Sequence, residues 1–324
     1  MSYYTLPSFN CNNIIFKNST TTSVSQTLVY YVNQCFNDLI KNDYFEFGKK
    51  YTHMLTLLKY KVDKDLDINF FNMIEINTIT NLINNKSNVL IIDKNKKIID
   101  DLIKYTTIFD ITNTDFYNIN NYEKYNCIFS NIMMKNKKDF LDNLKYIKIN
   151  QKIKGNMVIK LEDTYSNYSI NVIYILSLLY KKIVVIKPNS GNTFLFERYI
   201  VCKNFNKNVI NILDKIYSSL YNINSENFSI ENIPLFFLNK LDECNTIMGQ
   251  QQIDCILFMY QCNFLKEKTE KLENFYKKLN YKCQQWIESN NINETKFICN
   301  ECFETHHNDD IHEIIENIIN SIDK

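Results

Sequence analysis

Three residues near the C-terminus, Cys299, Cys302 and His306, have types and a spacing that could bind a metal ion. Two cysteines separated by two residues and followed by a histidine could supply thiolate and imidazole ligands to tetrahedral zinc, with Cys283 as a further ligand. A second paired motif of this kind is missing from the sequence, and residues 306–310 could instead begin a helix. The tail therefore leaves two hypotheses open, a structural zinc site or a helix start without metal.

A second set of candidate residues is charged and stands at the ends of apolar segments. Lys160 closes the apolar run that begins after Gly155, and Glu197 follows a short loop after the apolar run 182–186. Such runs are typical of strands buried in a sheet, so Lys160 would lie at a strand end and Glu197 in a hairpin. In these positions the two side chains could form a buried ion pair.

The elements that must position these residues belong to a sheet. Short apolar runs alternate with helical patterns over about 120 residues, which predicts an α/β fold with a doubly wound, mostly parallel sheet. The last two strands could form an antiparallel hairpin at one end of that sheet. The expected strands are Asn88–Ile92, Thr107–Ile111, Asn126–Phe129, Asn156–Leu161, Lys182–Ile186 and Phe196–Cys202, and the expected helices between them are Lys96–Tyr105, Asn136–Ile149 and Ser169–Tyr180.

Helical patterns also precede and follow this core. We expect an N-terminal helical segment over residues 1–85, a core over 86–240 and a helical C-terminal extension over 241–324. No repeat and no Gly/Ser/Pro-rich linker separates these parts, so we expect the helices to pack on the core. The expected helices outside the core are Ser25–Ile40, Asp67–Asn84, Gln250–Leu279, Tyr281–Glu288 and Asp310–Asp323.

The composition limits the classes of function. The chain has 324 residues, 37 of them basic and 36 acidic, and a formal net charge of +1. Proteins that hold nucleic acid mainly through its phosphates usually show a basic excess, so RNA contact here would need a local patch or a partner protein. The chain has no alanine and a single arginine, Arg198, which is typical of a very AT-rich genome such as that of a large DNA virus or a protozoan.

Cysteine usage and the apolar runs favour a cytoplasmic protein. The ten cysteines are scattered, and the first ten residues do not resemble a signal peptide, so we expect reduced thiols. The longest apolar stretch, Ile170–Tyr180, is too short to span a bilayer. We expect the host cytoplasm, with a viral factory or a virion as variants of that location, and no membrane partner.

Two motifs resemble a known family. The first runs from Gly155 to Lys160, and the second runs from Lys187-Pro188 through Glu197-Arg198-Tyr199 to Cys202-Lys203. Together they resemble the C-terminal half of the FtsJ-like RNA ribose 2'-O-methyltransferases, above all the enzymes of eukaryotes and large DNA viruses that make the cap-1 structure of mRNA. The spacing from the Lys-Pro pair to the Glu-Arg-Tyr triplet matches that of the family. The resemblance is good over Gly155–Phe205, fair over the tail and only topological before residue 150.

The resemblance implies a Rossmann-like methyltransferase fold and a catalytic set of lysine, aspartate, lysine and glutamate. In the family these residues activate the ribose hydroxyl, with a lysine of lowered pKa that takes its proton or stabilises the alkoxide. By position, Lys160 matches the second lysine and Glu197 matches the glutamate. Asn131 stands where the aspartate should end its strand, so one charge of the set is missing. The expected helix Asp67–Asn84, where the first lysine should lie, contains no lysine.

The family's cofactor loop is also altered. It normally follows the first strand and is rich in glycine, which lets the backbone approach S-adenosylmethionine closely. The segment Asp93–Ile98 at this place has no glycine or proline, and we expect it to leave no room for an adenosyl group. Asp93 and Asp110 stand where such folds bind a cofactor carboxylate or ribose. The alternative for each is an exposed loop aspartate.

The leading hypothesis is a catalytically silent methyltransferase-fold protein. It would act as a scaffold or regulatory subunit, with a protein partner in an RNA capping or transcription assembly and without a cofactor. The alternative is an active cap 2'-O-methyltransferase that uses S-adenosylmethionine, with Lys160 as the base and Glu197 as its partner. A third hypothesis is a zinc-stabilised nucleic-acid-binding module that uses the tail.

Overall fold

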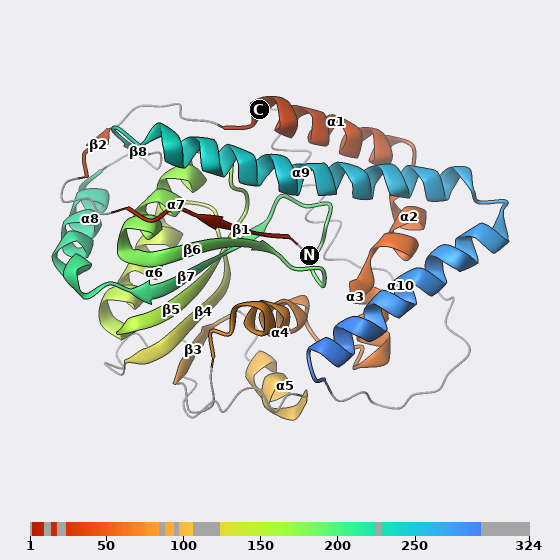
Figure 1. Cartoon of the computed structure of the whole chain (residues 1–324), viewed down its shortest axis with the longest axis horizontal. Helices are drawn as coiled ribbons and strands as arrows, with labels where there is room; N and C mark the ends of the chain where they lie inside the picture. The colour runs from red at the N-terminus through yellow and green to blue at the C-terminus, as the bar shows by residue number, and fades with distance from the viewer. Residues whose placement is uncertain are drawn as a thin grey trace. The chain divides into compact units, whose positions relative to one another are not determined.

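The computed structural model of the chain describes residues 2–9, 14–17, 24–83, 88–93, 97–105, 124–223 and 228–292. All of them belong to one compact unit, Met1–Glu294. Its centre is a sheet with the strand order β1-β6-β7-β5-β4-β3 (Figure 1). The strands are β1 (Ser2–Leu6), β3 (Val89–Ile92), β4 (Tyr125–Met134), β5 (Gln151–Leu161), β6 (Tyr180–Lys187) and β7 (Arg198–Phe205).

The strand directions make this sheet mixed. β3, β4 and β5 pair in parallel, whereas β7 is antiparallel to both of its neighbours, β5 and β6. β6 therefore runs in the same direction as β3, β4 and β5, and β1 closes the edge as an antiparallel strand. Two short strands, β2 (Phe16–Lys17) and β8 (Ser229–Ile230), form a separate antiparallel pair. The α/β class and the β6–β7 hairpin expected from the sequence are confirmed. The sheet differs from the expected mostly parallel one, because β1–β6, β6–β7 and β5–β7 pair antiparallel, and the hairpin lies inside the sheet, since β1 pairs beyond β6 and β5 beyond β7.

Helices cover both faces of the sheet (Figure 1). Side chains alternate between the two faces, as they must in strands: in β7, Ile200 and Cys202 join one apolar cluster, and Tyr199 and Val201 join the other. Helices α6, α7, α8 and α9 contribute to the first cluster, and helices α3, α4, α5 and α10 to the second. The helices are α1 (Gln26–Lys41), α2 (Phe45–Thr52), α3 (Met54–Lys61), α4 (Ile68–Thr80), α5 (Lys97–Tyr105), α6 (Lys137–Asn150), α7 (Asn167–Leu179), α8 (Ile210–Asn222), α9 (Leu235–Phe264) and α10 (Thr269–Ser289), with a short 3-10 turn, Lys207–Val209, before α8.

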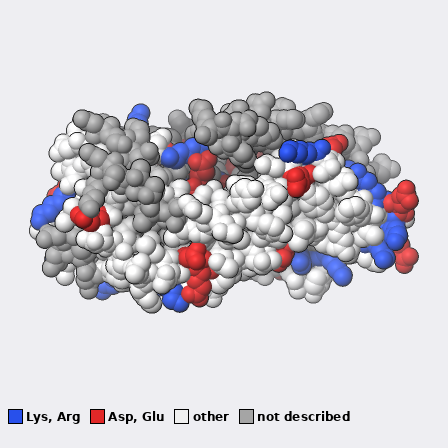
Figure 2. Space-filling view, turned by 90° about the horizontal axis from the view of Figure 1, so that it is seen from above, with Lys and Arg blue, Asp and Glu red and all other residues white. Residues whose placement is uncertain are grey.

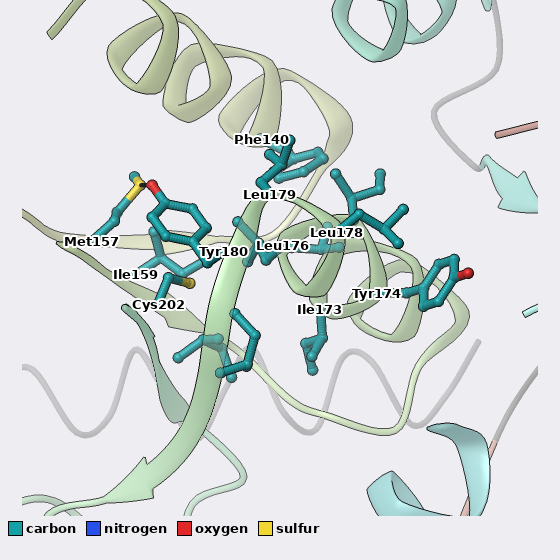
Figure 3. Packing of buried hydrophobic residues seen from close by; sticks show 14 of the residues in the cluster. Phe140, Met157, Ile159, Ile173, Tyr174, Leu176, Leu178, Leu179, Tyr180 and Cys202 are labelled. Carbon is teal, nitrogen blue, oxygen red and sulfur yellow. Dashed lines mark hydrogen bonds between the residues drawn. The ribbon is translucent and has the colours of Figure 1, made fainter. Parts of the chain in front are cut away.

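The packing around α7 shows why this core is specified by the sequence. From Ser169 to Leu179 every residue of α7 is buried, so the helix reads as a continuous apolar run rather than as an amphipathic pattern. Its side chains lie against the sheet and against Phe140 of α6 (Figure 3). At the end of α7 the chain passes directly into β6, and the Tyr180 hydroxyl lies 3.7 Å from the sulfur of Met157.

Most expected elements are present with shifted ends, and two expectations are wrong in detail. The strand expected over Asn126–Phe129 continues to Met134. The single helix expected over Gln250–Leu279 is divided into α9 and α10 by a turn at 265–268. The turn is required because α9 buries residues in the first cluster, whereas Leu279 and Cys283 of α10 are buried in the second. No glycine or proline marks it.

Some elements gave no usable signal. β1 is a short run that becomes a strand only because it pairs with β6, and α8 was not predicted. The expected strand Thr107–Ile111 and helix Asp310–Asp323 lie outside the described residues. The division of the chain at residues 85 and 240 stays a prediction, although β1 shows that the N-terminal part contributes to the sheet.

Two further findings concern membrane-spanning helices and disulfide bonds. Within the described ranges, no helix is both long enough and apolar enough to cross a bilayer. No disulfide bond joins the cysteines of these ranges, which are Cys35, Cys127, Cys202, Cys244, Cys255, Cys262 and Cys283.

Candidate functional site

The charged candidates meet at the end of the sheet where the parallel strands finish. Lys160 is the penultimate residue of β5, and Glu197 directly precedes β7, which runs the opposite way. Because Lys160 is in register with Tyr199, the antiparallel pairing brings Glu197 beside it. Open α/β sheets bind their ligands at this end of the strands. The fold therefore places the two residues singled out from the sequence where such a fold carries its chemistry.

Lys160 and Glu197 form a buried ion pair. The Lys160 Nζ lies 3.0 Å from Glu197 Oε2, and each side chain is only 10% exposed. A second lysine, Lys187, lies on the other side of the carboxylate, with its Nζ 3.9 Å from Glu197 Oε1. The Lys187 amine also donates hydrogen bonds to the backbone carbonyls of Leu195 and Glu197. One carboxylate thus faces two amines in a site that is largely closed to water.

The three charges affect one another's pKa in different directions. Burial alone would lower the pKa of Lys160, but the adjacent carboxylate of Glu197 outweighs burial and raises it above the ordinary lysine value. Burial lowers the pKa of Lys187 well below the usual range, because its distance from Glu197 is longer and two other cations lie nearby. Burial alone would raise the pKa of Glu197, and the two lysines together lower it. Lys160 is therefore held protonated at neutral pH.

Tyr199 lies beneath this pair and joins it to helix α4. The Lys160 amine lies 5.6 Å from the centre of the Tyr199 ring, within the range of a cation–π contact. The Tyr199 hydroxyl accepts a hydrogen bond from Asn72 at 3.1 Å and donates one to Asn69 at 3.4 Å. Burial raises the pKa of Tyr199 to about 12. α4 is oriented for these contacts by Asp67, whose side chain caps the helix by accepting from the Asn69 amide.

Asp93 lies at the end of β3 and belongs to the same network. It is only 3% exposed, and its Oδ2 accepts a hydrogen bond from Asn69 Nδ2 at 3.1 Å. The alternative of an exposed loop aspartate is therefore wrong for Asp93. Because β3 is covered on both faces, the first residue beyond it is still inside the protein. Its carboxylate is engaged by an amide of α4.

Asn131 lies inside β4 rather than at its end, at an irregularity of the strand. The pairing with β5 shifts between Ser130 and Met133, so that extra residues of β4 bulge opposite β5, just before the pair of Met133 with Lys160. Asn131 is 6% exposed, and neither its Oδ1 nor its Nδ2 has a hydrogen-bond partner among the described residues. The Ser130 hydroxyl is unpartnered in the same sense. The bulge therefore holds buried polar side-chain atoms that have no hydrogen-bond partner among the described residues.

The loop that precedes Glu197 is held from one side by α4 and α10. The carboxylate of Glu75, which is 2% exposed, accepts hydrogen bonds from the backbone amides of Asn189 and Ser190, both at 2.9 Å. It also accepts from the Ser190 hydroxyl at 2.7 Å and from the Trp286 indole at 2.8 Å. The Ser190 hydroxyl also lies 2.9 Å from Asn72 Oδ1, so its single proton is shared between the two acceptors. We call residues 188–197 the clamped loop.

His53, which directly follows α2, and helix α9 hold the other side of the clamped loop. His53 donates from Nε2 to Asn192 Oδ1 at 2.6 Å, and burial, together with the positive charge of Lys49, lowers the pKa of His53 to about 4. Gln252 donates to the Phe194 carbonyl and accepts from Arg198. The loop is thus fixed by side chains from three helices and by His53 between α2 and α3, which fixes Glu197 in turn.

Sequence reasoning found only part of this arrangement. It identified Lys160, Glu197, Asn131 and Asp93, but it missed the polar residues on α4 and the other side chains that hold the clamped loop. Their common signal is a polar residue every third position within an apolar helix, and these residues are Asn69, Asn72 and Glu75. The two lysines that precede α4 do not fill the missing position: Lys61 donates to Gln284 of α10, and Lys64 is exposed.

Several predicted site residues cannot be compared with the structure. Asp110, Cys299, Cys302 and His306 lie outside the described residues, as does the centre of the altered cofactor loop, 94–96. Cys283, the further zinc ligand of the hypothesis, is buried in α10 within the second apolar cluster. In the parts of the chain that the structure describes, no group of three or more His, Cys, Asp or Glu side chains could hold a metal ion.

Comparison with known proteins gives two partial matches. The chain is 31% identical over 105 residues to cap-specific mRNA (nucleoside-2'-O-)-methyltransferase 1 of Dictyostelium discoideum, which covers 31% of this chain and 14% of that protein. It is 36% identical over 64 residues to the protein of the same description from Drosophila melanogaster, which covers 20% of this chain and 8% of that protein. No family model matches the chain. The motifs, the fold and these matches together show that part of this chain is related to the FtsJ-like cap ribose 2'-O-methyltransferases.

Proposed function

We propose that this chain is a methyltransferase-fold protein that does not transfer methyl groups and acts as a scaffold or regulatory subunit in an RNA capping or transcription assembly. The observation that carries the proposal is the state of Lys160. A general base must have a pKa near the working pH and a free lone pair. Lys160 has a raised pKa and is bound to Glu197 at 3.0 Å, so it holds its proton.

The residues around Lys160 support the same conclusion. The position that resembles the family's aspartate is the uncharged Asn131, and α4 presents the amides of Asn69 and Asn72 rather than a lysine. Asp93 is already bound by Asn69. Several buried side-chain atoms near this end of the sheet, those of Ser130 and Asn131 and the Arg198 Nε among them, have no hydrogen-bond partner among the described residues.

The charge distribution supports protein contacts over autonomous RNA binding. The net charge is +1, and on the face seen in Figure 2 the described basic side chains lie interspersed with aspartates and glutamates. RNA binding through phosphates needs a stripe or patch of one sign. The assembly role therefore rests on a partner protein, with RNA held mainly by that partner.

Calorimetry with S-adenosylmethionine tests the loss of activity. We expect no heat of binding at cofactor concentrations of about 1 mM, where a functional site of ordinary affinity would saturate. Binding in the micromolar range would overturn the proposal. The assembly role has its own test: precipitation of the chain from its source cells should enrich capping or transcription subunits over a control precipitation, and their absence would contradict it.

A second candidate function is an active cap 2'-O-methyltransferase, and one observation favours it. The fold places Lys160 and Glu197 at the end of the sheet where open α/β folds bind their ligands, which is where the resemblance to the family puts catalytic residues. The test is transfer of labelled methyl from S-adenosylmethionine to capped RNA, with Lys160→Ala as the inactive control. Asn131→Asp sharpens the test, because it restores a carboxylate at the position where this chain has asparagine in place of the family's aspartate. Activity of the unaltered chain that Lys160→Ala abolishes would establish this second function.

A further inference from the structure

An open groove lies between the C-terminal half of α9 and the N-terminal half of α10, away from the site described above. It has a volume of about 640 Å³. After the turn at 265–268, α10 folds back beneath α9, so the two helices diverge from a common corner (Figure 1). None of the residues that line the groove belongs to the Lys160–Glu197 network. We call it the α9–α10 groove.

Each wall of the groove is one face of a helix. α9 contributes Leu257, Tyr260, Gln261 and Phe264, which are spaced i, i+3, i+4 and i+7 and therefore form one continuous stripe. α10 contributes Lys271, Asn274, Phe275 and Lys278 at the same spacing. Two such ridged walls at an angle are the geometry into which a third helix packs with its own ridges.

The α9 wall is apolar at positions that the protein's own core does not use. Phe264 is 77% exposed and Leu257 is 50% exposed, whereas Ile256 and Met259 on the opposite face of α9 are fully buried. Large exposed apolar side chains that lie together beside a groove are typical of protein contact sites. The α9 wall therefore offers anchors for the apolar face of another element.

The positive charges on the α10 wall determine the charge that the occupant of the groove should carry. Lys271 and Lys278 are the charged residues among the described groove lining, and no acidic side chain lines it with them. They lie two helical turns apart along one edge, so they face the flank of whatever lies in the groove. An occupant with a row of carboxylates on that flank would complement them.

The aromatic rings of the groove are less suited to nucleic acid. A single strand of RNA binds by stacking its bases on exposed ring faces and by a row of cations along its backbone. Here the Phe275 ring packs on Phe258, with centroids 4.9 Å apart, and Tyr44 packs edge-on between Tyr260 and Phe264. Tyr260 and Phe275 therefore pack on neighbouring rings, and the described lining supplies two cations for a nucleic-acid backbone.

We propose that the α9–α10 groove binds an amphipathic helix of a partner protein, with the apolar face of that helix on Leu257 and Phe264 and its acidic flank against Lys271 and Lys278. The proposal goes beyond the loss of methyl transfer and does not depend on it. It names the chemistry of one partner, which is a helix that carries leucine or phenylalanine on one face and glutamate or aspartate beside it.

The test is fluorescence anisotropy with the full chain and a labelled designed peptide of about 18 residues that is long enough to form several helical turns. The peptide carries Leu at i, i+3, i+4 and i+7 and Glu at the remaining flank positions. We expect micromolar binding that weakens about tenfold or more in the double variant Lys271→Glu/Lys278→Glu. Replacing the peptide's Glu by Lys should restore binding to this variant. Phe264→Ser should weaken binding to the unaltered peptide as well.

Matched controls separate the groove from general surface effects. Lys50→Glu/Lys277→Glu makes the same charge change on exposed lysines that do not line the groove, and Tyr221→Ser removes an exposed aromatic on α8. Both controls should bind the peptide as the unaltered chain does. No binding of the acidic peptide, or equal binding by the groove variants and the controls, would overturn the proposal. A labelled oligouridylate that binds the chain and is lost in the groove variants would assign the groove to RNA instead.

Discussion

The clamped loop and the β4 bulge lie at the same end of the sheet, but they differ in how their buried polar groups are satisfied. In the loop, the amides of Asn189 and Ser190 and the carbonyl of Phe194 are bound by side chains of surrounding helices. In the bulge, the side-chain polar atoms of Ser130 and Asn131 have no partner among the described residues. A buried polar group without a partner costs about 1–3 kcal/mol.

This difference separates a loop that contributes to stability from a bulge that does not. The loop has become part of the structure, because its hydrogen bonds join His53, α4, α9 and α10 to the sheet and fix Glu197. The bulge contributes no comparable bond and is kept at a cost in stability. The two regions should therefore respond in opposite ways to substitution: loss of a side chain should lower stability in the loop and should not lower it in the bulge.

The largest effect is expected for Glu75→Ala at the centre of the clamp. The substitution leaves two backbone amides, the Ser190 hydroxyl and the Trp286 indole without their buried acceptor. We expect the free energy of unfolding to fall by about 4 kcal/mol, measured by urea denaturation. Glu273→Ala, on the exposed surface of α10, should leave the midpoint nearly unchanged. Equal midpoints for the two variants would show that the clamp does not stabilise the fold.

The ion pair at the end of the loop should show an asymmetry between its partners. Glu197→Gln leaves Lys160 and Lys187 buried without a counter-charge, and we expect a loss of about 3 kcal/mol. Lys160→Met should cost clearly less, because the Lys187 amine remains 3.9 Å from Glu197 and its pKa rises once the competing charge of Lys160 is removed. Thermal and urea unfolding of both variants measure this order. The reverse order would mean that Lys187 does not neutralise Glu197 and that the proposed charge network is incorrect.

The sequence predicted the parts of this site that lie on strands, because strand ends are marked by apolar runs. Lys160 and Asp93 could be placed at strand ends from the pattern alone, and Glu197 could be placed from its motif. The ion pair between Lys160 and Glu197 could be foreseen as one possibility, but the strands that bring the two residues together are β5 and β7 and not the two strands of the predicted hairpin.

The clamp could not be predicted in this way. Glu75 and Ser190 are 115 positions apart in the chain, and their contact depends on where α4 packs against the sheet. Trp286 reaches the same carboxylate only because the chain turns at 265–268, where no glycine or proline marks the break. The absence of a hydrogen-bond partner for Asn131 could not be predicted either, because a bulge depends on the register between two strands and not on the sequence of one strand.

A pH experiment tests how His53, which directly follows α2, holds the clamped loop. The pKa of His53 is lowered to about 4 from 6.5 in the unfolded chain, so the native state keeps this ring neutral. Its contribution to stability is complete above pH 6.5 and is lost as the pH falls toward 4, since the unfolded chain takes up a proton that the native state refuses. Between pH 6.5 and pH 5 this amounts to about 2 kcal/mol. Urea denaturation across this range should show it.

The control for this effect is His53→Gln, which keeps an amide that can donate to Asn192 but does not titrate. The difference between the two proteins should change across the range, with the variant losing less stability on acidification. Parallel curves for the two proteins would mean that His53 is solvated or charged in the native state. In that case the clamped loop would be held less tightly on this side than the hydrogen bond indicates.

The smallest effect is expected in the bulge, and it is the sharpest test of the contrast. Asn131→Leu removes a buried amide that makes no hydrogen bond, so stability should stay the same or rise by up to about 1 kcal/mol. Asn171→Leu is the matched control: this buried amide of α7 donates to Phe228 O and accepts from Ile230 N, and its loss should cost about 3 kcal/mol. Urea denaturation of the two variants compares the same chemical change at a satisfied and an unsatisfied position. A similar cost at both would show that Asn131 has a bonding partner in solution, and the bulge would then be part of the structure in the same sense as the loop.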